Sequence, residues 1–253
     1  MKPLEIKHRV IGEPLICVPV VEQDAQSVIR EITYLSQSTA DMIEWRVDAF
    51  RDFTDYNAIR SVFEAVAPLL GEKLFLYTFR TAHQGGMAQV KAEQLDDLHD
   101  LAAESGCVDL VDLEFFEEDR PLHKIKRLRE MGVSVIASHH DFEQTPSPEV
   151  MKMLLEKMCA GGADIVKLAV MPQNYKDVLN LLDVTAQFRE ENPDTPVITM
   201  SMGSLGGISR ISGETFGSCV TFGAHEKPSA PGQFAMKELR QMLDTIHASS
   251  RIQ

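Results

Sequence analysis

The sequence predicts a closed (β/α)8 barrel, a TIM barrel, and three observations lead to this fold. Short apolar runs rich in β-branched residues recur at a steady spacing along the 253 residues, and helical patterns fill most of the gaps. Eight strands that alternate with eight helices form a parallel sheet. A chain of this length closes such a sheet into a barrel. The chain shows no linker or low-complexity tract, so we expect one domain over residues 1–253.

Each predicted strand is a short apolar run of the kind found in strands that are buried on both faces. In chain order the eight runs are 15–20, 42–47, 73–79, 108–113, 133–138, 163–169, 196–201 and 218–222. Ahead of them, Ile6, Val10 and Ile11 predict a short hairpin that covers the floor of the barrel, where the strands begin.

Each predicted helix is a longer segment with helical periodicity, and glycines 71, 106, 132 and 161 each follow such a segment and favour its end. In chain order the segments are 24–38, 56–69, 89–105, 121–131, 148–159, 175–190, 208–216 and 233–247. An open doubly wound sheet is the alternative. It would need a Gly-x-Gly-x-x-Gly turn after the first strand, where this chain has Pro19-Val20-Val21-Glu22.

Composition excludes several classes of partner. The net charge of −13 would repel phosphate backbones, so we expect no nucleic-acid binding. No apolar stretch approaches the roughly 20 residues of a membrane helix, and the first residues do not resemble a signal peptide. Four widely separated cysteines, Cys17, Cys107, Cys159 and Cys219, fit a cytoplasmic protein with reduced thiols.

Lys167 is the most informative residue, because it lies inside the apolar run 163–170. Burial disfavours the charged form of a lysine and lowers its pKa, and a neutral amine is a nucleophile for carbonyl carbons. The alternatives are an ion pair with a buried carboxylate, or an ammonium that reaches solvent at the strand end.

Further charged residues share the inward-facing parity of their strands, because strand side chains alternate with period two. Glu44, Arg46 and Asp48 point into the barrel, while Ile43, Trp45 and Val47 face the helices. The other inward residues are Arg80, Asp112, Glu114 and Lys167. Each could belong to a structural ion pair, which we favour for Asp48, Asp112 and Glu114. Together their cations favour an anionic ligand at the carboxyl ends of the strands, where barrel enzymes carry their sites.

His140 ends the strand next to that of Lys167 and can move protons for an imine-forming lysine. His139 has the opposite parity, so we expect it to be structural. A zinc site on His139, His140 and Asp141 lacks the usual ligand spacing, and we expect no metal.

Two glycine-rich loops follow the last strands. Residues 203–207 stand where many barrels bind phosphate, although the loop could equally be a flexible connection. Residues 223–233 form a long polar segment that could close as a lid. Met200, Met202, Phe142 and Phe222 are expected to fill space near the mouth and to keep the lysine pocket dry.

Taken together, these motifs resemble the type I 3-dehydroquinate dehydratases of the shikimate pathway, and they cover nearly the whole chain. The matching segments include Glu44-Trp45-Arg46-Val47-Asp48, Thr78-Phe79-Arg80-Thr81, Asp112-Leu113-Glu114, Ser138-His139-His140-Asp141-Phe142, Ile165-Val166-Lys167-Leu168-Ala169, Thr199-Met200-Ser201-Met202-Gly203, Ile208-Ser209-Arg210 and Ser229-Ala230-Pro231-Gly232-Gln233.

The resemblance implies a hydro-lyase that works without metal or cofactor in a TIM barrel, as a homodimer. Lys167 would form an imine with the C3 ketone of 3-dehydroquinate, and His140 would take the C2 proton and later protonate the C1 hydroxyl. Arg210 would hold the substrate carboxylate through paired hydrogen bonds. The remaining substrate-binding residues would be Glu44, Arg46, Arg80, Ser229 and Gln233, with support from Gln84, Met202 and Phe222.

Two positions depart from the family pattern. Relatives commonly carry a glutamate where this chain has Gln84, which can orient His140 but offers no negative charge. We therefore expect a lower pKa for His140 than in relatives with the acid. Pro19 stands where relatives often carry serine, so one hydroxyl contact would be absent.

Two other functions remain open at this point. Aldolase barrels that form a Schiff base also place their lysine on the sixth strand, but they act on phosphorylated sugars. A non-catalytic barrel that binds a hydroxy acid would need neither Lys167 nor His140.

Overall fold

Eight parallel strands form the centre of the computed structural model, which describes residues 4–250. Their order in the sheet follows their order in the chain, with β10 beside β3, and each neighbouring pair is parallel. The strands are β3 (Leu15–Val20), β4 (Met42–Arg46), β5 (Leu74–Thr78), β6 (Leu110–Glu114), β7 (Ser134–Asp141), β8 (Ile165–Val170), β9 (Val197–Ser201) and β10 (Val220–Phe222).

The sheet closes into a barrel where β10 meets β9. The backbone N–H of Cys219 donates to the carbonyl oxygen of Val197 at 2.8 Å, and Ser218 forms a parallel bridge with Val197. Closure with sequential strand order is the arrangement of a (β/α)8 barrel and excludes a doubly wound sheet. The predicted fold class is therefore confirmed.

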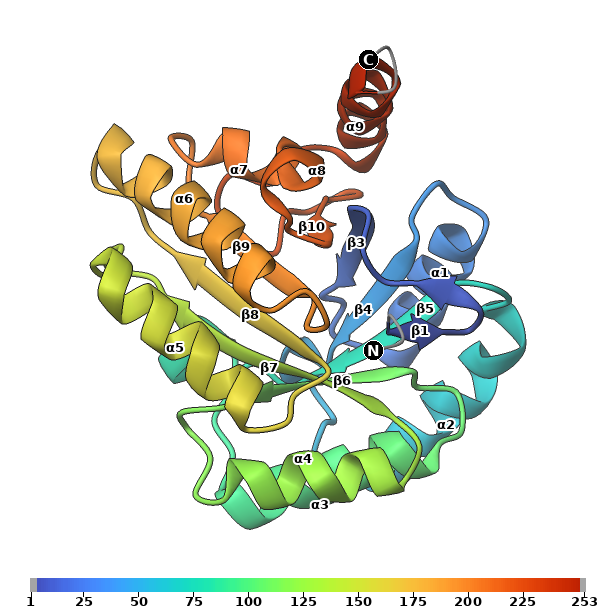
Figure 1. The fold of residues 1–253 in the computed structure, drawn as a ribbon. Coiled ribbons are helices and arrows are strands. Elements are labelled where there is room, and N and C mark those ends of the chain that lie inside the picture. Colours follow the sequence, from blue (N-terminus) through green and yellow to red (C-terminus); the bar gives the residue numbers. More distant parts are fainter. Residues whose placement is uncertain (1–3, 251–253) are drawn as a thin grey trace.

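The predicted N-terminal hairpin is also present, as β1 (Glu5–Ile6) paired antiparallel with β2 (Arg9–Val10). At its turn, Lys7 Nζ donates to the carbonyl oxygen of Lys73 at 3.0 Å and lies 2.8 Å from the carboxylate of Asp109. Both partners directly precede a barrel strand, β5 and β6. The hairpin therefore lies across the floor, as Figure 1 shows.

Helices surround the strands (Figure 1), and several begin at side-chain caps that the sequence supplies. Asp24 accepts a hydrogen bond from the backbone of Ser27 ahead of α1, and Asn174 forms a capping box with Asp177 ahead of α6. The helices are α1 (Ala25–Ser36), α2 (Tyr56–Val66), α3 (Ala92–Glu104), α4 (Pro121–Glu130), α5 (Pro148–Ala160), α6 (Tyr175–Glu191), α7 (Gly207–Ile211), α8 (Gly213–Phe216) and α9 (Met236–Ser250). Short 3-10 turns add η1 (Val47–Ala49), η2 (Ala67–Leu69) and η3 (Ala82–Gln84).

Several predicted helix boundaries differ from the structure. The segment 208–216 is divided at Ser212 into α7 and α8, and the α-helix predicted over 56–69 ends at Val66. The helices predicted from residues 89 and 233 begin at Ala92 and Met236. The Gln233 side chain bonds Ser229 within the loop that precedes α9. In the part of the chain that the structure describes, every helix is too short or too polar to cross a bilayer.

The apolar residues divide into an outer and an inner layer, as the alternation of strand side chains requires. Trp45, Val166 and Leu168 pack in the outer layer between strands and helices, whereas Ile165 and Ala169 pack inside the barrel. The predicted facing of β4 and β8 is confirmed, and it directs the charged residues of these strands toward the barrel axis.

Candidate active site

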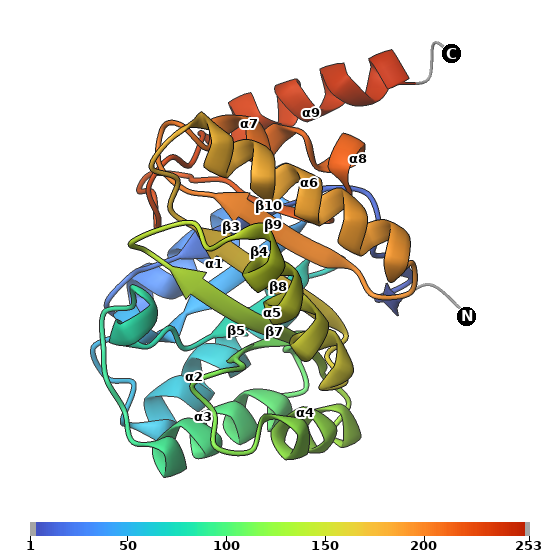
Figure 2. The same ribbon diagram turned by 60° about the vertical axis from the view of Figure 1, so that its left-hand side comes forward.

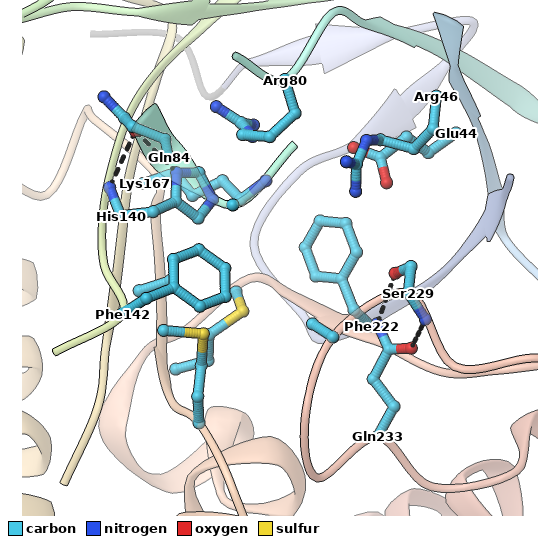
Figure 3. Close-up of a pocket in the computed structure, with 15 residues that line it drawn as sticks. Glu44, Arg46, Arg80, Gln84, His140, Phe142, Lys167, Phe222, Ser229 and Gln233 are labelled. Atoms are coloured by element: carbon cyan, nitrogen blue, oxygen red, sulfur yellow. Dashed lines mark hydrogen bonds between the residues drawn. The ribbon is translucent and has the colours of Figure 1, made fainter. Parts of the chain in front are cut away.

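A cavity at the carboxyl ends of the strands, with about 460 Å³ of space when its open, solvent-filled mouth is included, contains most of the predicted site (Figure 3). The predicted residues that line it are Glu44, Arg46, Arg80, Gln84, His140, Lys167, Met202, Phe222, Ser229 and Gln233. Gly85, Phe142, Ala169, Met200 and Ala230 complete the wall. Residues of β4, β7, β8, β9 and β10 thus converge on one volume with the loops that follow β5 and β10.

Lys167 lies in β8 with its side chain inside the barrel and is only 3% exposed. Its Nζ donates to Asp112 Oδ2 at 3.1 Å and lies 4.5 Å from the centre of the Phe222 ring. The amine is therefore paired with a buried carboxylate, which was one of the alternatives. Lys167 also lines the cavity.

Arg80 joins Lys167 in one buried ionic network. Its guanidinium lies 2.7 Å from Asp112 and 2.9 Å from Glu114, and it also donates to Ser138 at 3.1 Å. Burial disfavours the charged form of Arg80, but the two carboxylates outweigh this and raise its pKa. Burial alone would raise the pKa of Asp112, but Arg80 and Lys167 outweigh it and hold the pKa of Asp112 well below its ordinary value.

Arg46 and Glu44 lie on the neighbouring part of the wall (Figure 3). Arg46 makes a bidentate pair with Asp48, with both N–O distances at 2.7 Å, because the η1 turn brings Asp48 back beside the strand end. Glu44 Oε1 accepts a hydrogen bond from Thr78 Oγ1 at 2.8 Å. The structural pairing expected for Asp48, Asp112 and Glu114 is confirmed.

His140 is held by the amide of Gln84, and this contact fixes the tautomer of the imidazole. Gln84 Oε1 lies 2.9 Å from the backbone nitrogen of His140 and 3.0 Å from its Nδ1. A backbone N–H can only donate, so the facing atom of Gln84 is its oxygen. The same oxygen then accepts from Nδ1–H, and the lone pair of the neutral ring is on Nε2. Burial, and after it the charges of Arg80 and Lys167, lower the pKa of His140 well below 6.5.

Phe142 and Gly85 pack around His140. The rings of Phe142 and His140 are nearly parallel, with 19° between their planes and 6.4 Å between their centres. A Cβ atom at Gly85 would lie 2.4 Å from the Phe142 ring, and its φ of +81° favours glycine. His139 lies outside the cavity wall, where its ring contacts Phe116 edge-on.

The loop between β10 and α9 covers one side of the cavity (Figure 3). Ser229 and Gln233 bond each other twice, with the Ser229 N–H donating at 2.8 Å and Gln233 Nε2 donating to Ser229 Oγ at 3.0 Å. The carbonyl oxygen of Pro231 accepts from the backbone of Gly203 at 3.2 Å. The two loops predicted to flank the mouth are therefore joined.

Arg210 does not line the cavity, in contrast to the other predicted binding residues. Its side chain is 1% exposed, and Nη2 donates to the Pro231 carbonyl oxygen at 2.9 Å. Nε and Nη1 are buried without a hydrogen-bond partner in the described structure, and burial lowers the pKa of Arg210 to about 10. A buried guanidinium with two unpaired nitrogens can accept an anion.

Two further observations complete the site. Pro19 is buried in β3 opposite Glu44, outside the cavity wall. Between residues 4 and 250, no three His, Cys, Asp or Glu side chains are grouped so that they could hold a metal ion.

Sequence reasoning missed Gly85 and Ala230 as wall residues. A Gly-Gly pair after a strand end was the only signal for Gly85.

Comparison with known proteins agrees with this geometry. The family model "Type I 3-dehydroquinase" matches residues 16–250. The 3-dehydroquinate dehydratase of Syntrophotalea carbinolica is 42% identical over 93% of this chain and 94% of that protein, and that of Listeria welshimeri is 41% identical over 98% and 99%. The solved type I 3-dehydroquinate dehydratase of Clostridium difficile, which carries covalently modified comenic acid, is 38% identical, with a TM-score of 0.94 over 98% of this chain and 99% of that chain. The protein whose barrel and cavity are described above belongs to the type I 3-dehydroquinase family.

Proposed function

We propose that the protein is a hydro-lyase that converts 3-dehydroquinate to 3-dehydroshikimate through an imine on Lys167, with His140 as the acid and base. The observation that carries the proposal is the placement of a buried lysine and a tautomer-fixed histidine in one cavity. Family membership supports the substrate, because relatives at about 41% identity are named 3-dehydroquinate dehydratases. The aldolase and the non-catalytic barrel lack such support.

The cavity has two chemically different walls, which orient a polyhydroxylated ring. Glu44, Arg46 and Arg80 present charged groups on one side, whereas Met200 and Met202 present apolar surface on another. Hydroxyl groups would face the charged wall, and the less polar edge of the ring would face the methionines. Such a ring would be held with its ketone toward Lys167.

Imine formation is balanced by one proton that moves through His140. Neutral His140 takes a proton from the Lys167 ammonium, and the free amine attacks the C3 carbonyl carbon to form a carbinolamine. The imidazolium then returns the proton to the carbinolamine hydroxyl, which leaves as water. The nitrogen carries one positive charge before and after these steps, first as the ammonium and then as the iminium.

Elimination uses the iminium as an electron sink. His140 Nε2 takes the C2 proton and produces a neutral enamine, and the imidazolium then protonates the C1 hydroxyl, which leaves as a second water. Hydrolysis of the conjugated iminium consumes one water and releases the enone with the Lys167 ammonium. One water is therefore released in the complete cycle.

Arg210 would bind the substrate carboxylate with its free Nε and Nη1. The same guanidinium already holds the Pro231 carbonyl oxygen through Nη2. One side chain, Arg210, would therefore bind the substrate carboxylate and hold the 223–235 loop in place at the same time. The docked loop would restrict the access of water during chemistry.

The test is incubation with 3-dehydroquinate while the ultraviolet absorbance of a conjugated enone is followed, and then reduction with borohydride and mass spectrometry. We expect enone formation and a ligand mass fixed to Lys167 in the wild type, with neither in Lys167→Ala. In His140→Ala the enone should be lost, and the trapped adduct should still form but more slowly than in the wild type, because His140 also carries the proton of imine formation. Enone formation by Lys167→Ala would refute the covalent route. Cleavage of a phosphorylated sugar without enone formation would favour the aldolase.

We also propose that the protein forms a homodimer through an apolar surface at the catalytic end of neighbouring helices. Figures 1 and 2 show α5 and α6 side by side, with α7 beyond α6. Large exposed apolar side chains near the starts of these helices are Val150, Met153, Tyr175, Leu179, Leu205 and Ile208. A cluster of this kind is typical of a protein interface.

Sedimentation of Leu179→Lys tests the dimer. Leu179 is 65% exposed on α6, and Leu122, which is 59% exposed on α4, is the matched control. We expect Leu179→Lys to shift the protein to monomers and Leu122→Lys to leave the dimer intact. Equal sedimentation of all three proteins would refute this interface.

We place the protein in the cytoplasm. All four cysteines are free thiols, two of them buried, which fits a reducing compartment. Activity confined to the soluble cytoplasmic fraction of cells that express the chain is the expected result.

A further inference from the structure

Gln84 has a second side-chain partner, the carboxylate of Glu117, in addition to His140. Its Nε2 donates to Glu117 Oε1 at 3.5 Å, while its Oε1 accepts from His140. A glutamine amide has one acceptor end and one donor end, and a carboxylate can only accept. The three side chains therefore form a continuous chain of hydrogen bonds, from His140 Nδ1–H to Gln84 and from Gln84 to Glu117.

We infer that Glu117 is a positioning residue for His140: its carboxylate anchors the amide of Gln84 and, through it, the imidazole tautomer that leaves Nε2 free to accept a proton. This inference rests on the proposed function of His140 as the base. Glu117 neither touches the reacting atoms nor lines the cavity, and it acts through Gln84, which does line it.

Glu117 is exposed, so its position needs a structural cause. Its backbone N–H donates to the carbonyl oxygen of Glu114 at 3.0 Å, which fixes the turn that follows β6. The Glu114 carboxylate accepts from Thr81 twice, from the backbone N–H at 2.9 Å and from Oγ1 at 2.7 Å. Thr81 begins the turn that contains η3 and Gln84. The two turns that carry Gln84 and Glu117 are therefore tied to each other by Glu114.

Gln84 also has little freedom of its own. The side chain is buried, at 2% exposure, and its oxygen serves two donors of His140. Without an acceptor at Glu117, the buried NH2 group would lose its hydrogen bond. An unsatisfied buried donor costs free energy, so rotation of the amide toward solvent would become more favourable. His140 Nδ1 would then lose its acceptor, and the tautomer with hydrogen on Nε2 would become populated. That tautomer cannot accept the C2 proton.

Other charged or titratable groups also face His140, and a test of Glu117 must leave these side chains unchanged. They are Glu44, Arg46, Arg80, His139 and Lys167. Substitution at Glu117 leaves these side chains in place, but it removes a charge that raises the pKa of His139. Glu117→Gln removes the same charge and keeps the acceptor, so a tautomer change seen in Glu117→Leu but not in Glu117→Gln is assigned to the Gln84 contact.

The experiment compares Glu117→Leu, which removes the acceptor, with Glu117→Gln, which keeps an amide oxygen as acceptor without the charge. Asp119→Leu is the matched control, because Asp119 is an exposed acid two residues further along the same loop. The measurements are kcat and KM for enone formation, and ring-nitrogen NMR of His140 in the unliganded protein.

For Glu117→Leu we expect kcat to fall about three- to tenfold with KM unchanged, because the charge-assisted contact is lost from a partly solvated site. The His140 spectrum should show a new population with hydrogen on Nε2. Glu117→Gln should keep kcat within about twofold of the wild type, as expected when an acceptor rather than a charge is needed.

Equal kcat and identical ring-nitrogen signals in Glu117→Leu and Asp119→Leu would overturn the inference. A rise in KM with unchanged kcat would also overturn it, since it would assign Glu117 to binding. Failure of the proposed function is distinguishable, because the wild type itself would then form no enone. The NMR signals of the unliganded protein would still decide whether Glu117 sets the tautomer.

Discussion

Replacing Gln84 by glutamate is the sharpest test of how the protein sets the proton affinity of His140. The Gln84 oxygen lies 3.0 Å from His140 Nδ1, so a carboxylate in the same place would form an ion pair with the imidazolium. In the wild type, burial together with Arg80 and Lys167 lowers the pKa of His140 well below 6.5, and a neutral amide offsets little of this. We therefore expect Gln84→Glu to raise the pKa of His140.

The size of the change follows from the geometry. A full charge at 3.0 Å with an effective dielectric constant of about 20 contributes at most about 5 kcal/mol. Two effects reduce this value. The amide oxygen of Gln84 already accepts from His140 Nδ1–H in the wild type, and the new carboxylate would face Glu117, whose Oε1 is 3.5 Å from Gln84 Nε2. A shift of about one to two pH units is therefore expected, within the range seen for paired groups.

The assay is NMR titration of His140 with the pH profile of kcat/KM. Since the base must be unprotonated, the acid limb should move to higher pH by the same amount as the NMR midpoint. Gln144→Glu is the control, because it adds the same charge at an exposed position in the loop after β7. Gln84→Glu/Glu117→Gln should show a larger rise than Gln84→Glu alone. Identical His140 midpoints in the wild type and Gln84→Glu would refute the reasoning.

Stability gives an independent check with a defined sign. Because the folded state of the wild type holds His140 neutral, the unfolded state binds an extra proton once the pH falls below about 6.5. The free energy of unfolding should therefore decrease as the pH falls. In Gln84→Glu this decrease should end at a higher pH, and below both folded-state pKa values it should be smaller by about 1.4 kcal/mol for each pH unit by which the pKa is raised. Denaturant unfolding at a series of pH values from about pH 7 downward measures the difference.

Three further substitutions test other parts of the site. Gly85→Ala should lower both stability, by about 1–3 kcal/mol, and kcat, because its Cβ would displace the Phe142 ring at a φ of +81°. Thermal unfolding against Gly71→Ala, which has φ of +52° and open space around it, separates backbone strain from this clash. Arg210→Lys keeps the charge but loses the planar fork, so KM should rise about tenfold or more; an unchanged KM would remove Arg210 from carboxylate binding. Gly232→Ala would place its Cβ 2.3 Å from a backbone oxygen of the loop after β9. It should lower kcat/KM by undocking the lid loop, and unaltered kinetics would contradict a role for that contact.

Most of the barrel could be predicted because strand alternation determines which side chains share a volume. Once β4 and β8 are recognised, Arg46 and Lys167 must point toward the axis, opposite Trp45 and Leu168. Helix boundaries were harder to predict where a side chain forms hydrogen bonds within the adjacent loop. Gln233 satisfies the helical pattern, but it bonds Ser229 and remains in the loop.

The sequence predicted that inward carboxylates would be paired, but it could not predict their partners, because these depend on register and on turns. Lys167 reaches Asp112, which lies two strands away, across Ser138, the register partner of Lys167 on β7. Arg46 pairs with Asp48 only because η1 returns the chain toward the strand end. The contact between Gln84 and Glu117 joins two turns and leaves no periodic pattern in the sequence.

The double partnership of Asp112 bears on how the proposed cycle avoids an unpaired buried charge. Asp112 accepts from Lys167 at 3.1 Å and lies 2.7 Å from Arg80. Ammonium and iminium place the same charge beside Asp112, so Asp112 has a cationic Lys167 partner before and after imine formation. The free amine, the carbinolamine and the enamine are neutral, and in these three states Arg80 alone compensates Asp112 while the proton is on His140. A lone Lys–Asp pair would expose a buried carboxylate in these states, which is costly. The Arg80 contact thus permits the lysine to lose its charge without reorganisation of the site.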